Sequence, residues 1–143
     1  MKTEPTVDFD TMISQADDAV ETLTPWDVQT ILDGQGDSQG DSDEHVLLVD
    51  IRDIRELERE GRIPGSTHVP RGMLEFWIHP DSPYFKDYFD AADRVILHCN
   101  RGWRSALAAK ALQDIGLEVA HMSGGYSEWV KLGLATETVE KRR

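Results

Sequence analysis

Three short apolar runs constrain the fold of this chain most strongly. They are VLLVDI at residues 46–51, RVILH at 94–98 and LEVAHM at 117–122. Apolar strands of this kind are typical of a parallel sheet that is covered on both faces. Helical patterns separate the runs, and strands that alternate with helices pair in parallel through right-handed crossovers. The sequence therefore predicts an α/β fold, a three-layer α/β/α sandwich with a central, mainly parallel sheet of about five strands.

Capping signals and periodicity locate the helices between these strands. Thr24 and Asp27 stand at capping-box spacing and predict a helix over residues 25–33. Asp53 and Glu56 have the same spacing and predict a second, shorter helix. Further helices are expected at residues 8–21, 103–116 and 126–133, and a short strand at 66–70.

The length of 143 residues fits one folded domain. We assign residues 22–135 to this domain and residues 136–143 to a C-terminal tail. Residues 1–21 are expected to form an N-terminal extension whose amphipathic helix packs on the domain. The stretch DGQGDSQGDSDEH at 33–45 has no apolar content and predicts an exposed, mobile loop.

Composition and charge exclude several classes of protein. No apolar run approaches the ~18 residues of a membrane helix, and the N-terminus lacks the basic start and apolar core of a secretory signal. A single cysteine excludes an internal disulfide framework, so we expect a cytoplasmic protein. The net charge of −12 disfavours nucleic acid and anionic membranes as partners. The histidines are scattered without an HxxxH pair, so we expect no metal site, and no cofactor is indicated.

The single cysteine lies in the segment VILHCNRGWRSALAAK. Cys99 directly follows the predicted strand at 94–98. It therefore lies at the carboxyl ends of the strands, where open α/β folds bind ligands. Backbone N–H groups and the positive end of the following helix should converge on its sulfur. Arg101 and Arg104 add positive charge, and Gly102 permits a backbone conformation that a side chain would obstruct. These influences favour a reactive thiolate, whereas the alternative is an inert, packed cysteine.

Three segments, in this order and spacing, resemble a rhodanese-like (sulfurtransferase) domain. They are LLVDIRDIRELEREGRIPGSTHVP, CNRGWRSALAA and MSGGYSEWVKLG, and the resemblance covers roughly residues 22–135. It implies that Cys99 takes a sulfane sulfur from a donor such as thiosulfate and becomes a persulfide. The sulfur then passes to cyanide, a small thiol or a protein acceptor. With no second cysteine in the chain, the persulfide must be resolved by that external acceptor.

The same resemblance assigns roles around the cysteine. It implies that Arg104 acts in catalysis with its guanidinium pointing back at the Cys99 sulfur, while Arg101 lies exposed near the crest of the loop. Asp50 and Arg52 match the family's Asp-x-Arg pair and are expected to form an ion pair near the site. The residues expected to bind the substrate or cradle the persulfide are Asn100, Arg101, Gly102, Trp103 and Ser105.

Other residues near these motifs carry expectations of their own. Arg62, where the family often has histidine, either adds positive charge near the site or forms a surface ion pair. His98 adjoins Cys99, but consecutive strand residues face opposite sides, so we expect a packed histidine rather than a general base. Gly124 and Gly125 are expected to pack closely beside the cysteine loop. Aromatic side chains expected in the core or pocket wall are Phe76, Trp77, Tyr84, Phe85, Tyr88, Phe89 and Trp103.

Two alternatives to sulfur transfer remain open from the sequence. Phosphatases and arsenate reductases of related fold use a Cys-x5-Arg loop, whereas the arginine here is Arg104, one position earlier, and the smaller loop suits a terminal sulfur better than a phosphate. Many rhodanese-like domains only bind or regulate partners. Those commonly lack the cysteine, so the presence of Cys99 favours an enzyme.

Overall fold

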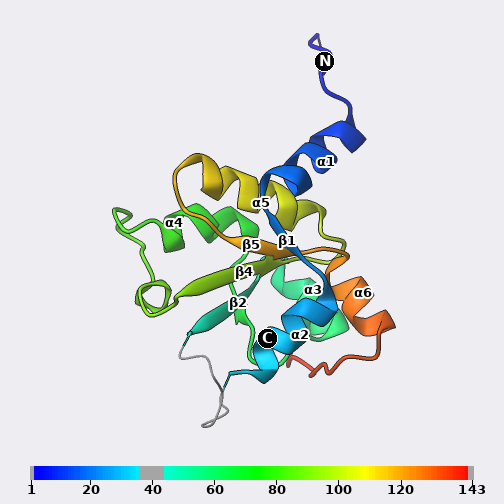
Figure 1. Cartoon of the computed structure of the whole chain (residues 1–143), viewed down its shortest axis with the longest axis vertical. Coiled ribbons are helices and arrows are strands. Elements are labelled where there is room, and N and C mark those ends of the chain that lie inside the picture. The colour runs from blue at the N-terminus through cyan, green and yellow to red at the C-terminus, as the bar shows by residue number, and fades with distance from the viewer. Residues whose placement is uncertain (1, 36–43, 142–143) are drawn as a thin grey trace.

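The computed structural model describes residues 2–35 and 44–141, in which helices cover both faces of one sheet (Figure 1). The sheet has the strand order β1-β5-β4-β2-β3, and all neighbouring strands pair in parallel. The strands are β1 (Glu21–Leu23), β2 (Val46–Asp50), β3 (Thr67–His68), β4 (Arg94–His98) and β5 (Ala120–Met122). The predicted fold class is confirmed.

The helices divide between the two faces of the sheet. One hydrophobic core joins α4 and α5 to the sheet, and the other joins α2 and α6 to its opposite face. Figure 1 shows α1 lying beside α5 on the first of these faces, and α1 contacts α5 more than any other element. The helices are α1 (Phe9–Ala19), α2 (Pro25–Asp33), α3 (Ile54–Glu60), α4 (Leu74–Ile78), α5 (Trp103–Asp114) and α6 (Gly125–Lys131).

Strand β2 shows why its run of apolar residues is continuous. Leu47 and Val49 belong to the core on the α5 face, whereas Val46 and Leu48 belong to the core on the α6 face. All residues of β2 are buried. Because successive side chains point to opposite sides of a sheet, a strand between two helical layers needs apolar residues at every position.

Both predicted capping boxes are present. Thr24 accepts a hydrogen bond from the Asp27 N–H and Asp27 accepts one from the Thr24 N–H, at the start of α2. Asp53 and Glu56 form the second box, at the start of α3. These helices start where the sequence predicts because the caps satisfy orphan N–H groups through residues three positions apart.

Strand β1 was not located from the sequence. Its residues pair with β5 in the register Thr22↔His121, which places β1 at the edge of the sheet. The segment has too few apolar residues for a strand pattern and is extended because it pairs with β5. The strand predicted at 117–122 is shorter than expected and begins at Ala120.

The N-terminal helix packs less completely than expected. Ala16 and, just beyond the helix, Val20 are buried, but Phe9 and Met12 are 52% and 39% exposed. The first turns of α1, which carry Phe9 and Met12, extend past the edge of the molecule (Figure 1).

The remaining segments add two observations. Residues 36–43 of the predicted loop lie outside the described residues. Beyond residue 135, Arg62 and Glu137 exchange two backbone hydrogen bonds of 2.9 Å, so the chain there still contacts the body of the molecule. Within the described parts of the chain, no helix is both long enough and apolar enough to cross a bilayer.

Candidate active site at the carboxyl end of strand β4

Cys99 lies directly after β4 and just before α5. The residue is 1% exposed, and the Gly102 N–H donates a hydrogen bond of 3.2 Å to its sulfur. The sulfur therefore lies at the N-terminus of a 12-residue helix, where the first N–H groups lack helical acceptors and the helix dipole favours negative charge.

A small cavity opens above the sulfur. It measures about 180 Å³ and is lined by Cys99, Asn100, Arg101, Trp103 and Arg104. Pockets for drug-sized ligands measure roughly 300–1,000 Å³, so this cavity suits a small anion. The structure thus brings together most of the loop residues that the sequence singles out.

Two close backbone approaches shape the cysteine loop. Gly102 has φ +88°, and a Cβ at this position would lie 3.1 Å from the Gly124 nitrogen. A Cβ on Gly125 would lie 2.6 Å from the Asn100 carbonyl. The Tyr126 N–H also donates to the Cys99 carbonyl at 2.8 Å. The expected packing of the Gly124–Gly125 pair beside the cysteine loop is therefore confirmed, and a Cβ at Gly125 would clash with the backbone of that loop.

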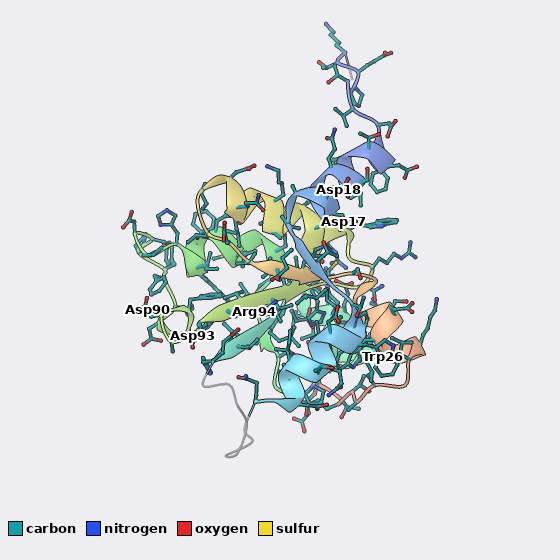
Figure 2. The ribbon with its side chains drawn as sticks, viewed as in Figure 1. Asp17, Asp18, Trp26, Asp90, Asp93 and Arg94 are labelled. Carbon is teal, nitrogen blue, oxygen red and sulfur yellow. The ribbon has the colours of Figure 1, made fainter. Side chains whose placement is uncertain are left out.

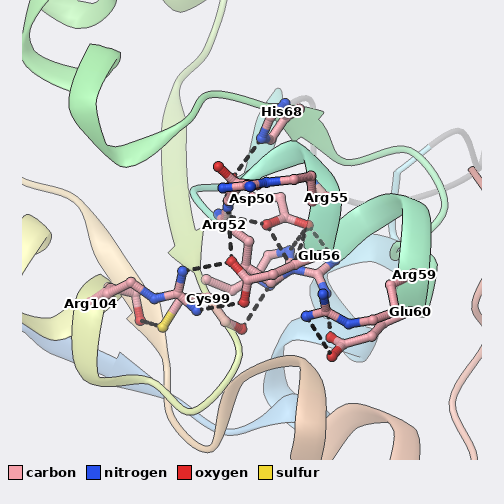
Figure 3. Close-up of polar contacts among 12 residues, drawn as sticks. Asp50, Arg52, Arg55, Glu56, Arg59, Glu60, His68, Cys99 and Arg104 are labelled. Atoms are coloured by element: carbon pink, nitrogen blue, oxygen red, sulfur yellow. Dashed lines mark hydrogen bonds and ion pairs between the residues drawn. The ribbon is translucent and has the colours of Figure 1, made fainter. Parts of the chain in front are cut away.

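Arg104 has a partner that the sequence did not reveal. Its two terminal nitrogens donate to the two carboxylate oxygens of Glu56, at 2.8 and 2.9 Å (Figure 3). This hydrogen bonding raises the pKa of Arg104, and the Cys99 sulfur adds a smaller contribution in the same direction. The guanidinium thus lies near the sulfur, as expected, but its charge is balanced by Glu56. Glu56 was predicted only as a capping residue, and nothing local in the sequence identifies a partner 48 positions away.

The other predicted loop residues lie around the cavity mouth and behind the sulfur. Arg101 is exposed, with its guanidinium 5.4 Å from the centre of the Trp103 ring. Trp103 is 44% exposed and forms an edge contact with Phe9 of α1. Ser105 is fully buried, and its hydroxyl oxygen lies 3.6 Å from the Cys99 sulfur.

A buried ion pair lies beside the site (Figure 3). Arg52 is fully buried and donates to Asp50 at 2.8 Å and to the Gly61 carbonyl at 2.8 Å. Its guanidinium also lies 4.1 Å from the centre of the Tyr126 ring. Asp50 and Arg52 thus tie the end of β2 to the turn after α3 and to Tyr126 of α6, whose N–H donates to the Cys99 carbonyl.

Expectations for neighbouring residues have mixed outcomes. His98 is fully buried, its ring lies 3.7 Å from Asp50, and burial lowers its pKa, so it is a packed neutral histidine as predicted. Arg62 forms an ion pair with Glu137, which is the surface alternative. Phe76 and Tyr84, expected in the core or pocket wall, do not lie in the core: they are 53% and 63% exposed, because the 71–89 connection winds over the surface in short turns.

His121 in β5, which was not predicted as a site residue, contacts Ser105 directly. Its Nδ1 lies 3.0 Å from the Ser105 hydroxyl. Alternation along β5 carries the relevant signal, because Ala120 and Met122 belong to the core on the α6 face and His121 must point to the face of Cys99 and α5. Among residues 2–35 and 44–141, no group of three or more His, Cys, Asp or Glu side chains is arranged to hold a metal ion.

Comparison with known families agrees with this geometry. The sequence-family model of the rhodanese-like domain matches residues 36–132, which is more than half of the chain. This chain belongs to the rhodanese-like family. The match includes β2, the cysteine loop and α6, whereas α1, β1 and α2 precede it.

Individual relatives extend the match. A protein of unknown function from Rhodopseudomonas palustris CGA009, described as a possible tyrosine phosphatase, has 43% sequence identity and a TM-score of 0.82, covering 96% of this chain and 99% of that one. The polysulfide-sulfur transferase homodimer of Wolinella succinogenes has 25% identity and a TM-score of 0.63, over 94% of this chain and 90% of that one.

A curated mouse relative is matched over part of its length. Thiosulfate sulfurtransferase/rhodanese-like domain-containing protein 3 of Mus musculus is 29% identical over 101 residues, which is 66% of this chain and 64% of that protein. The aligned region therefore spans less than two thirds of the mouse protein.

Proposed function

We propose that this rhodanese-like domain is a sulfurtransferase that carries a sulfane sulfur as a persulfide on Cys99. The observation that carries the proposal is the buried sulfur at the N-terminus of α5, with the Gly102 N–H 3.2 Å away and a small cavity above it. The sulfur transfer named for the mouse and Wolinella succinogenes relatives supports the same chemistry.

The reaction takes place in two displacements. The Cys99 thiolate attacks the outer sulfur of thiosulfate, a new S–S bond forms, and sulfite leaves with the electron pair of the old S–S bond. The terminal sulfur of the persulfide then accepts attack by cyanide or a thiolate acceptor, and the Cys99 thiolate leaves. Both displacements pass through anionic sulfur, which the Gly102 N–H and the N-terminus of α5 stabilise.

The cavity mouth fits an anionic donor. Arg101 is exposed there and supplies a positive charge that attracts thiosulfate or a polysulfide. Arg104 supplies directed N–H donors, but Glu56 already accepts two of them, so its contribution to anion binding is limited. We propose that the donor is a small sulfur anion and that the acceptor is cyanide, a small thiol or a protein thiol.

Intact-protein mass spectrometry tests the proposal. Incubation with thiosulfate should add the mass of one sulfur atom, and cyanide should remove it with release of thiocyanate. The Cys99→Ser variant is the matched control, since it retains a small polar side chain and should do neither. Full sulfur loading of that variant would show that the sulfur is not carried on Cys99 and would overturn the assignment.

Phosphate hydrolysis is the competing activity, because the Rhodopseudomonas palustris relative is described as a possible tyrosine phosphatase. The Cys-x4-Arg spacing and the Arg104–Glu56 pair both disfavour it, since an arginine bound to a carboxylate has few donors left for phosphate. We expect negligible turnover of p-nitrophenyl phosphate by the protein that accepts sulfur. Efficient phosphate release without sulfur loading would support the phosphatase instead.

A further inference from the structure

A chain of polar contacts leads from the Cys99 sulfur to the molecular surface. The sulfur lies 3.6 Å from the Ser105 hydroxyl, which lies 3.0 Å from Nδ1 of His121. Nε2 of His121 in turn lies 2.7 Å from Oδ1 of Asp17. Ser105 and His121 are buried, whereas the Asp17 side chain is 41% exposed. Three elements, α1, α5 and β5, therefore meet behind the sulfur.

The hydrogens in this chain can be assigned from the donors and acceptors. Burial lowers the pKa of His121 below its ordinary value, although the neighbouring Asp17 opposes the shift, so the ring is neutral in the resting protein. A neutral imidazole has one donor and one acceptor nitrogen, and a carboxylate only accepts. Nε2–H therefore donates to Asp17, and Nδ1 accepts from the Ser105 hydroxyl. The free lone pairs of the Ser105 oxygen are left to accept from the Cys99 thiol.

The surroundings of His121 contribute no competing charge among the described residues. Its partners in register are Thr22 of β1 and Leu97 of β4, which are uncharged, and α5 contributes Ser105. Asp17 of α1 is the charged side chain that faces the ring. A proton that reaches Nδ1 thus forms an imidazolium held beside one carboxylate.

We propose that Ser105, His121 and Asp17 form a proton relay that converts the Cys99 thiol into the thiolate. The S–H bond breaks as its proton passes to the Ser105 oxygen, and the Ser105 hydroxyl proton passes to Nδ1 of His121. The products are a thiolate and an imidazolium, no electrons are transferred, and the Asp17 carboxylate stabilises the new positive charge. The Ser105 hydroxyl then donates to the thiolate and accepts from Nδ1–H, so both hydrogen bonds of Ser105 are retained with their directions reversed, while Nε2–H still donates to Asp17.

The relay also gives α1 a function. The helix precedes the segment matched by the family model, and its Asp17 completes the chain of contacts. Figure 2 shows Asp17 on the part of α1 that approaches the sheet, with Asp18 as its neighbour. Ser105 contacts the reacting sulfur, whereas His121 and Asp17 act through Ser105 and are positioning residues.

Alkylation of Cys99 by iodoacetamide across a pH series tests the relay, because the full chain has one cysteine and the reagent reports its thiolate. Asp17→Asn retains an acceptor for Nε2–H but removes the charge. It should lower the alkylation rate at neutral pH about tenfold, as expected for loss of one charge-assisted hydrogen bond. Asp18→Asn removes an exposed charge one position away and is the matched control, for which we expect the wild-type pH profile.

A double variant separates the relay from a merely structural role. Ser105→Ala removes the link between His121 and the sulfur, so adding Asp17→Asn to it should have no further effect on alkylation. Independent, multiplicative effects of the two substitutions, or equal profiles for Asp17→Asn and Asp18→Asn, would overturn the relay.

The inference rests on the proposed function because it activates the same nucleophile, yet the two fail separately. A protein that shows the predicted alkylation pattern but gains no sulfur from thiosulfate refutes sulfur transfer and supports the relay. If all variants gain sulfur equally well and their alkylation profiles are unchanged, sulfur transfer is supported and the relay is refuted.

Discussion

The Arg104–Glu56 ion pair places one positive and one negative charge near the Cys99 sulfur, and substitutions can separate the two. Glu56→Gln leaves the cation alone, Arg104→Ala leaves the carboxylate alone, and the double variant removes both. A nearby cation stabilises a thiolate and a nearby anion destabilises it. Alkylation at neutral pH should therefore decrease in the order Glu56→Gln, wild type, double variant, Arg104→Ala.

The expected difference in alkylation rate between successive proteins in this order depends on how far solvent screens the Arg104 and Glu56 charges. Two unit charges 4 Å apart interact by about 4 kcal/mol at an effective dielectric constant of 20, and solvent reduces this to ~1 kcal/mol for exposed pairs. The Arg104 side chain is 42% exposed and that of Glu56 is 17% exposed. We therefore expect each step to change the alkylation rate about threefold to tenfold.

Thermal unfolding measures the same pair independently. Glu56→Gln removes the ion pair, and a loss of ~1 kcal/mol in the free energy of unfolding lowers the unfolding midpoint of a protein of this size by about 4 °C. Hydrogen bonds from Arg104 are the main reason that the pKa of Glu56 lies below its ordinary value of 4.5, although burial opposes them. The stabilisation is therefore present above pH 4.5 and lost as the pH falls through the lowered pKa, where wild type and Glu56→Gln should converge.

Equal alkylation rates in all four proteins would refute the electrostatic reasoning, and circular dichroism would verify that each is folded. A double variant that reacts as slowly as Arg104→Ala would show that the Glu56 charge does not reach the sulfur.

Three further substitutions or conditions test other parts of the structure. Arg101→Ala should raise the KM for thiosulfate by up to about fivefold at low ionic strength, an effect that disappears with added salt because the side chain is exposed. Burial lowers the pKa of both His98 and His121 below 6.5, so the free energy of unfolding, measured by urea denaturation, should decrease as the pH falls through 6.5, when the unfolded histidines take up protons first. Gly125→Ala introduces a Cβ 2.6 Å from the Asn100 carbonyl at φ +61°, so it should lower the thermal midpoint and sulfur loading together, and a wild-type midpoint would contradict this packing.

The elements predicted correctly are those whose signals are local. The buried strands at 46–50 and 94–98 show continuous apolar residues, and the two capping boxes join residues three positions apart. Each signal lies within a few residues because the physical cause, burial on two faces or satisfaction of a helix end, also lies there. The cysteine loop belongs to the same class, since a strand end and a helix start are adjacent along the chain.

The features missed depend on contacts between distant parts of the chain. Arg104 and Glu56 are 48 positions apart, and Asp17 and His121 are 104 positions apart. The sequence has more acidic than basic residues, so every arginine and lysine has several acidic residues with which it could pair. Which acid meets which base is decided by the packing of α1 and α3 around α5, and a pattern along the chain does not encode that choice.

These long-range contacts divide the site into two sides with different tasks. On the cavity side the charges of Arg104 and Glu56 balance, so under the proposed function donor binding would rely on the exposed Arg101 and the N–H groups of the loop. On the buried side Ser105 links the sulfur to His121 without exposing the sulfur to bulk water. Since the two sets of residues have no side chain in common, we expect that substitution of the exposed Arg101 can change donor preference while the proposed relay through Ser105, His121 and Asp17 stays intact.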